Sequence, residues 1–109
     1  MDKKTIDTTV YKLSGHPTLT GYRQLATAVQ YCLEDGAFPA RNLTVTLYPR
    51  IAASLCQTPR SVARSISRAV DDCWEYGDRK VLEGIAGRRI REKPTPGEMI
   101  FFLYRYLSR

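Results

Sequence analysis

The chain has 109 residues, the length of one domain, and its 43% apolar and 26% charged residues are ordinary for a globular protein. Seventeen Lys and Arg against eleven Asp and Glu leave a net charge of +6, which favours an anionic partner such as nucleic acid. The amino-terminal residues lack the apolar segment of a signal peptide, and the longest apolar run, 99–104, is too short to cross a bilayer. This composition argues against disorder and against a membrane protein, and we expect a cytoplasmic domain.

The residue types that carry catalysis or bind metals are scarce. His16 is the only histidine, and Cys32, Cys56 and Cys73 are far apart, with no Cys-x-x-Cys pair. A zinc site needs several clustered ligands, and nucleophilic catalysis needs a base beside the nucleophile. We therefore expect no enzyme activity, no metal and no cofactor, and we expect the cysteines to be buried reduced thiols.

Apolar spacing and stop signals predict three helices in the first half of the chain. The first two cover residues 4–14 and about 19–34, each followed closely by a glycine. The third covers residues 45–56, with Pro49 in or near its first turn, because a proline further inside would break the helix. Alternating residues at 43–48 resemble a strand only briefly, and the proline favours a helix start.

The second half of the chain has three further helices, predicted over residues 59–76, 79–86 and 99–107. Thr58 is a capping residue and Pro59 is suited to a first helical turn, so the first of these has a strong start. Thr95 and Glu98 form the pattern of a capping box before the last helix. The fold class predicted is all-α, a compact six-helix domain.

The helix predicted over 59–76 carries its charges against the helix dipole. Arg60, Arg64 and Arg68 lie in its amino-terminal half, and the acidic residues lie near its end. At about 100° per residue the arginines span an arc of roughly 80°, flanked by Ser61 and Ser67, with the apolar residues opposite. This face presents guanidinium groups with small side chains between them.

The helix over 45–56, a short link at 57–58 and the helix over 59–76 have the order of a helix-turn-helix. In that motif the second helix enters the major groove of DNA, where arginine bonds the guanine edge. The candidates for base contact are Arg60, Ser61, Arg64, Ser67 and Arg68. The alternative is that the arginine row is a solvated charged face.

Candidates for phosphate contact lie outside this helix. Arg88, Arg89 and Arg91 belong to a basic segment at 79–93, which could otherwise be a solvated loop. Thr44 and Thr46 lie near the start of the helix over 45–56, where a hydroxyl can donate to phosphate, although Thr44 could simply cap the helix.

From about residue 15 to 107 the chain resembles the C-terminal DNA-binding effector domains of stage-zero sporulation response regulators of spore-forming bacteria. The matching residues are Gly21-Tyr22, the segment LYPRIA at 47–52, Val62, Arg64, Ile66, Ala69, Trp74, Gly77 and KPT at 93–95. The resemblance implies a six-helix fold with a central helix-turn-helix and sequence-specific binding of double-stranded DNA in transcription regulation. It also implies pairs of domains on repeated sites, hence a homodimer on DNA.

The resemblance places Arg64 on the family's arginine that reads a guanine. The chain departs from the family pattern at Ser61, Ala63 and Ser67, where charged residues are usual, and it has Arg60 and Arg68 where other residues are common. The family's regulators also carry a receiver domain, and we expect this chain to be a single helix-turn-helix domain over 1–109 without one.

A second function is compatible with the same fold. The last helix is apolar on nearly every side, although we expect Phe101, Phe102 and Leu103 to pack in the core. A part left exposed would suit a protein-interaction module that binds or inhibits another regulator through this helix.

Overall fold

A computed structural model of the chain describes residues 2–39 and 43–108, with the side chains of all of these except 43 and 44. These described residues form six α-helices and no strand, so the predicted all-α class is confirmed. The helices are α1 (Lys3–Leu13), α2 (Thr20–Asp35), α3 (Tyr48–Ser54), α4 (Pro59–Tyr76), α5 (Arg79–Ala86) and α6 (Pro96–Leu107), and a π-helical segment, η1 (Leu43–Leu47), precedes α3. None of these helices is long and apolar enough to span a membrane.

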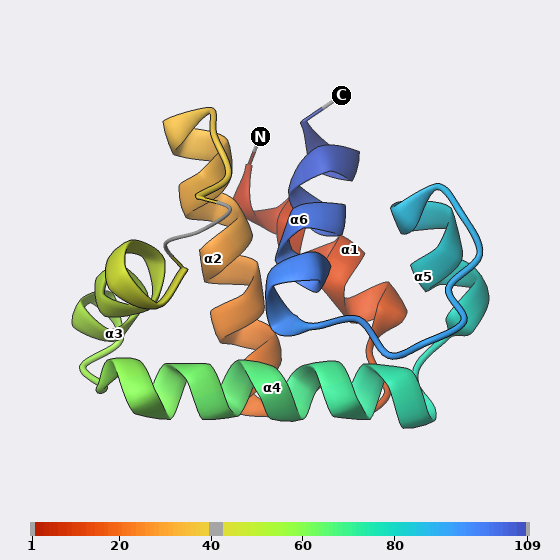
Figure 1. Cartoon of the computed structure of the whole chain (residues 1–109), viewed down its shortest axis with the longest axis horizontal. Coiled ribbons are helices and arrows are strands. Elements are labelled where there is room, and N and C mark those ends of the chain that lie inside the picture. Colours follow the sequence, from red (N-terminus) through yellow and green to blue (C-terminus); the bar gives the residue numbers. More distant parts are fainter. Residues whose placement is uncertain (1, 40–42, 109) are drawn as a thin grey trace.

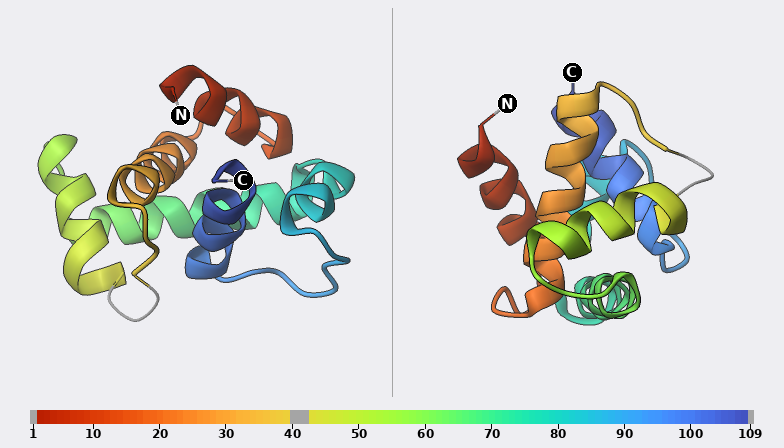
Figure 2. Two further views of the ribbon diagram at one scale, coloured as in Figure 1. Left: turned by 90° about the horizontal axis from the view of Figure 1, so that it is seen from above. Right: turned by 90° about the vertical axis from the view of Figure 1, so that its left-hand side faces the viewer.

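Helix α4 lies across one side of the domain, and α2 and α6 stand on it (Figure 1). Helices α3 and α5 lie near its two ends, and α1 packs beside α2 (Figure 2). The start of α1 and the end of α6 lie on the opposite side of the domain from α4 (Figure 1). The outer side of α4 is therefore left uncovered by the other helices.

Helix α4 has the bounds that its sequence predicts. The side chain of Thr58 accepts a hydrogen bond from the Ser61 backbone N–H at 3.1 Å, and Pro59 occupies the first turn. One face is buried in the domain core, and its buried apolar residues are Val62, Ile66, Ala69, Val70 and Cys73. That face anchors the helix and directs the opposite face to solvent.

The third helix differs from its prediction over 45–56 at both ends. Residues up to Leu47 form η1, and α3 has Pro49 in its first turn, as expected. The helix ends early because Cys56 takes a left-handed conformation, with φ of 54°, and the Gln57 N–H bonds the Ala52 carbonyl at 2.8 Å. Cys56 is exposed, so the expectation of a buried thiol was wrong there, whereas the other two cysteines are buried.

We expect Cys56→Gly to raise the free energy of unfolding by about 1 kcal/mol. Glycine adopts the left-handed conformation without the clash that a β-carbon causes there, and this gain exceeds its entropic cost. Urea unfolding of Cys56→Gly and Cys56→Ser measures the effect, since serine keeps the β-carbon. A glycine variant less stable than the serine variant would contradict the explanation.

Helix α6 begins three residues before the predicted start at Met99, immediately after Thr95, the N-cap of the capping box. The Glu98 N–H donates to the Thr95 hydroxyl at 3.1 Å, and the Thr95 N–H donates to the Glu98 carboxylate at 2.9 Å. Phe102 is buried as expected, as is Leu103. Phe101 is 38% exposed and lies against the Phe38 ring, with centroids 5.2 Å apart, so its assignment to the core was wrong.

Candidate nucleic-acid interface

The helix-turn-helix consists of α3, the turn at 55–58 and α4. Tyr48 and Ile51 bury one side of α3 in the core. Gln24 of α2 is completely buried, and its side-chain amide donates to the side-chain oxygen of Gln57 in the turn. This hydrogen bond fixes the turn against α2, so α2 positions both helices of the motif.

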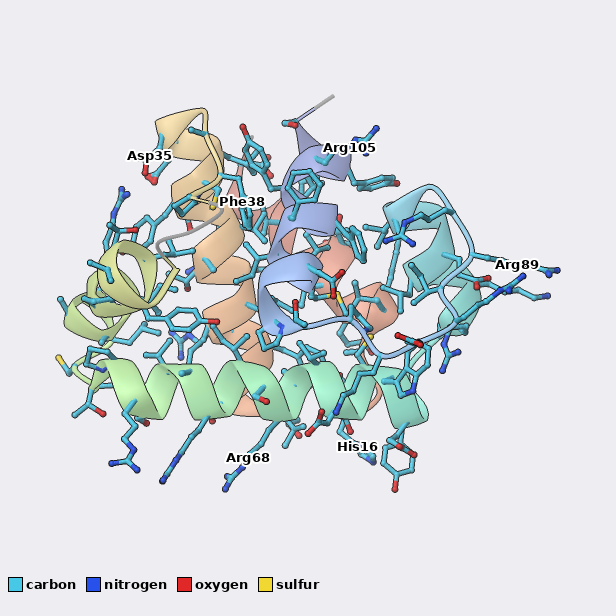
Figure 3. The ribbon with its side chains drawn as sticks, viewed as in Figure 1. His16, Asp35, Phe38, Arg68, Arg89 and Arg105 are labelled. Atoms are coloured by element: carbon cyan, nitrogen blue, oxygen red, sulfur yellow. The ribbon has the colours of Figure 1, made fainter. Side chains whose placement is uncertain are left out.

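The arginine row, Arg60, Arg64 and Arg68, lies on the solvent side of α4. All three residues are exposed, and Figure 3 shows Arg68 pointing away from the domain on the outer side of the helix. Ser61 is also exposed and Ser67 is half-buried. Within residues 2–39 and 43–108, no carboxylate forms an ion pair with any of the three guanidinium groups.

Other basic residues form contacts with neighbouring residues of the domain. Arg50 pairs with Asp35 at 2.7 Å, and Lys93 pairs with Asp71 at 2.7 Å. The Arg79 guanidinium lies 3.4 Å from the centre of the Trp74 ring and donates to the Trp74 carbonyl at 2.9 Å. These contacts distinguish structural cations from the arginine row, whose charges remain available to a partner.

The basic segment after α5 lies on a different side of the domain from the arginine row. Arg88, Arg89 and Arg91 line a groove of about 470 Å³, and the Arg88 guanidinium lies 5.4 Å from the centre of the Phe102 ring. Figure 3 shows Arg89 pointing to the side, beyond α5, and not in the direction of Arg68. The structure therefore groups the three arginines of this segment but separates Arg89 from the outer side of α4.

The two threonines predicted near the start of the motif fall in η1. Thr46 is exposed. The Thr44 side chain lies outside the part of the chain that the structure describes.

A polar cluster that the sequence did not reveal joins the α1–α2 turn to α4. The Asp72 carboxylate is 9% exposed and accepts hydrogen bonds from the His16 N–H at 2.7 Å and the Tyr22 hydroxyl at 2.6 Å. Its second oxygen lies 2.5 Å from His16 Nδ1. The Gly15 N–H donates to the Tyr22 oxygen at 3.1 Å. Tyr22 and His16 lie 50 and 56 positions from Asp72 in the sequence, too far apart for a periodic pattern to link them.

The cluster determines which form of Asp72 is stable. Burial raises the pKa of Asp72, but hydrogen bonds from Tyr22 and His16 outweigh burial and leave the pKa below its ordinary value of 3.8. Burial and the hydrogen bond to Asp72 raise the pKa of Tyr22. The cluster therefore holds a carboxylate beside a neutral phenol, and the carboxylate stabilises the fold above the ordinary carboxyl pKa.

We expect Asp72→Asn to lower the free energy of unfolding at pH 7 by about 2 kcal/mol, because an amide cannot accept all of these hydrogen bonds. A lowered pKa gives stability that is complete above about pH 4 and lost as the pH falls through the folded-state value, so the deficit should shrink at pH 3. Urea unfolding at both pH values measures it. Asp71→Asn is the control, since its exposed pair with Lys93 contributes little. An Asp72→Asn deficit equal at both pH values would contradict the assignment.

The arrangement defines an all-α domain of the helix-turn-helix class, with an anchored second helix whose exposed amino-terminal half is cationic. A family model described as Sporulation initiation factor Spo0A C terminal matches residues 6–107. The chain therefore belongs to this family of sporulation transcription-factor effector domains, a family of transcription factors and not of enzymes. The match begins earlier than the resemblance at residue 15 and includes most of α1.

Proposed function

We propose that this domain binds double-stranded DNA sequence-specifically in transcription regulation, with the amino-terminal half of α4 in the major groove. The observation that carries the proposal is the arginine row, which is exposed on the uncovered side of the second helix of a helix-turn-helix and forms no ion pair with the part of the chain that the structure describes. Membership of the sporulation transcription-factor family supports the same function.

The dimensions of the row suit the groove. Its first and last arginines are eight positions apart, about 12 Å along the helix axis, and the major groove is about 12 Å wide. Arg64 lies at the centre and is assigned to a guanine edge, with Arg60 and Arg68 on neighbouring bases. Ser61 and Ser67 are small enough for close approach and can donate to bases.

Phosphate contacts are proposed to surround this centre. Thr44 and Thr46 precede α3 and would meet one strand. Arg88, Arg89 and Arg91 would reach only duplex that flanks the central site, because Arg89 points away from the side on which Arg68 lies (Figure 3). Two copies of the domain would occupy repeated sites, as the resemblance implies.

The salt dependence of duplex binding tests this function. We expect the logarithm of the association constant to fall linearly with the logarithm of salt concentration, with a slope of about −0.9 for each phosphate contact. Fluorescence anisotropy with a labelled duplex measures the association constant at salt concentrations from roughly 50 to 300 mM, and these values give the slope. Absence of duplex binding at the lowest salt concentration would contradict the proposal.

A second candidate function is supported by α6. Phe101 and Tyr106 are each 38% exposed on this helix, which leaves aromatic surface for a protein partner. Figure 3 shows Phe38, the neighbour of Phe101, at the other side of the domain from Arg68. An apolar interface formed there would depend little on salt, so the same titration separates the two functions.

A further inference from the structure

We propose that His16 is a phosphate-contacting residue that extends the arginine row of α4 from the α1–α2 turn. This inference rests on the proposed function, because it assigns one further contact to the same face. It concerns the sugar–phosphate backbone of the duplex and not its bases.

The position of His16 follows from the register of α4. Arg60, Arg64 and Arg68 recur every four residues, and the next residue in this series is Asp72, an acid that would repel DNA at the surface. Asp72 is only 9% exposed, whereas the His16 side chain bonded to it is 61% exposed. Figure 3 shows His16 and Arg68 on the same outer side of α4. The histidine thus shields the acid and takes the place of a fourth basic residue.

The imidazole is held in one orientation. Asp72 engages Nδ1 at 2.5 Å, and its other oxygen accepts the His16 backbone N–H at 2.7 Å. The ring packs edge-on against Tyr76, with centroids 5.1 Å apart. Because Nδ1 is occupied, Nε2 is the ring nitrogen that remains to meet a partner.

The turn that carries His16 is pressed onto α4. A β-carbon on Gly15 would lie 2.7 Å from the Tyr76 Cβ and 2.8 Å from an Asp72 carboxylate oxygen. The buried Cys73 thiol donates to the Leu13 carbonyl at 3.3 Å, just before the turn. His16 is therefore fixed relative to the arginine row before any ligand arrives, which lowers the entropic cost of a contact.

The distance along α4 indicates which part of DNA His16 meets. Residue 72 lies about 12 Å beyond residue 64 along the helix axis, a length comparable to the full width of the major groove. A helix centred on Arg64 has left the groove at that point and crosses a phosphate strand. A phosphate oxygen accepts hydrogen bonds only, so the Nε2 atom must carry a proton, and the imidazolium is the form that binds best.

The contact should make DNA affinity depend on pH. The titratable groups that contact His16 or its carboxylate partner are Asp72 and Tyr76 of α4 and Tyr22 of α2. Carboxylic acids and tyrosines ordinarily titrate outside the range from about pH 6 to 8, where histidine changes its charge. The pKa values of Asp72 and Tyr22 are shifted still further from that range. A change of affinity with pH in this range is therefore assigned to the contact between imidazole and phosphate.

The test compares wild-type protein, His16→Gln and His16→Arg on one labelled duplex at about pH 6 and pH 8, the limits of histidine titration. We expect wild-type affinity to be about five- to tenfold higher at pH 6, with a salt slope steeper by about 0.9. His16→Gln should show the weaker affinity at both pH values, and His16→Arg the stronger. Wild-type affinity that is equal at both pH values, or a pH dependence that His16→Gln retains, would overturn the proposal.

Calorimetry on the wild-type chain supplies a second measurement should a variant fail to fold. Titration of the duplex near pH 7 in buffers of different ionisation enthalpy reports proton uptake, which we expect to be positive, and zero uptake would overturn the assignment. Failure of the proposed function has a different signature. In that case wild type does not bind duplex at all, whereas failure of this inference alone leaves binding that Arg64→Ala weakens and His16→Gln does not.

Discussion

Replacing Gly21 with alanine is expected to destabilise the domain by about 3 kcal/mol or more, at the upper end of the cost of overpacking. A β-carbon on Gly21 would lie 1.9 Å from the Ser65 carbonyl oxygen and 2.8 Å from the Ala69 Cβ. The oxygen belongs to the backbone of α4, so no side-chain rotation relieves the clash, and α2 and α4 must move apart. The apolar contacts between these two helices would then be lost together.

Urea unfolding measures this effect, and Gly84→Ala is its matched control. Gly84 lies inside α5, and among the described residues nothing beyond its chain neighbours and its own helix backbone lies within 4 Å of the position that its β-carbon would occupy. Alanine there should stabilise the domain by about 0.5–1 kcal/mol, because glycine is a poor helix former. A Gly21→Ala variant that remains within about 1 kcal/mol of wild type, well below the cost of such overpacking, would show that the two helices do not cross at this glycine.

Replacing Arg64 with alanine is expected to lower affinity for the specific site by about 10- to 100-fold, the value of one bidentate arginine–guanine contact. Affinity for an unrelated duplex should fall much less, because that binding depends on the summed charge of the face. Anisotropy titrations with both duplexes measure the difference. The fold should be unaffected, since Arg64 is exposed on α4.

Arg105→Ala is the matched control for charge. Arg105 is an exposed residue in the last turn of α6, and Figure 3 places it on the opposite side of the domain from Arg68. Its loss removes the same formal charge and should leave both affinities nearly unchanged. Equal losses from Arg64→Ala and Arg105→Ala would mean that net charge, and not a contact by α4, determines binding.

The helices were predictable where local signals determine them. Helix α4 begins at a Thr-Pro pair, and the bounds 59–76 follow from that cap and from apolar periodicity. Helix α6 begins directly after Thr95, the N-cap of its capping box. The segment before α3 was not predictable, because nothing in its composition distinguishes a π-helical segment from the first turns of an α-helix. The left-handed Cys56 also escaped prediction, because glycine usually occupies that position.

One part of the candidate site could likewise be predicted from local sequence, whereas another part depends on tertiary packing. The arginine row follows from a spacing of four residues on one helix, so its common face could be calculated from the sequence. The bond between His16 and Asp72 joins residues 56 positions apart and depends on how a turn packs against a helix. The pair Gly21-Tyr22 stands out in the sequence only through the family resemblance. The structure explains both residues: the missing side chain of Gly21 lets α4 approach closely, and the Tyr22 hydroxyl donates to Asp72.

The most direct test of the central claim is selection from a pool of random duplexes, followed by sequencing, with wild type and Arg64→Ala in parallel. We expect wild type to enrich a motif that contains a guanine at a fixed position, and Arg64→Ala to relax the preference at that position while the rest of the motif persists. No enriched motif with wild type, or a motif that Arg64→Ala leaves unchanged, would contradict base recognition by α4.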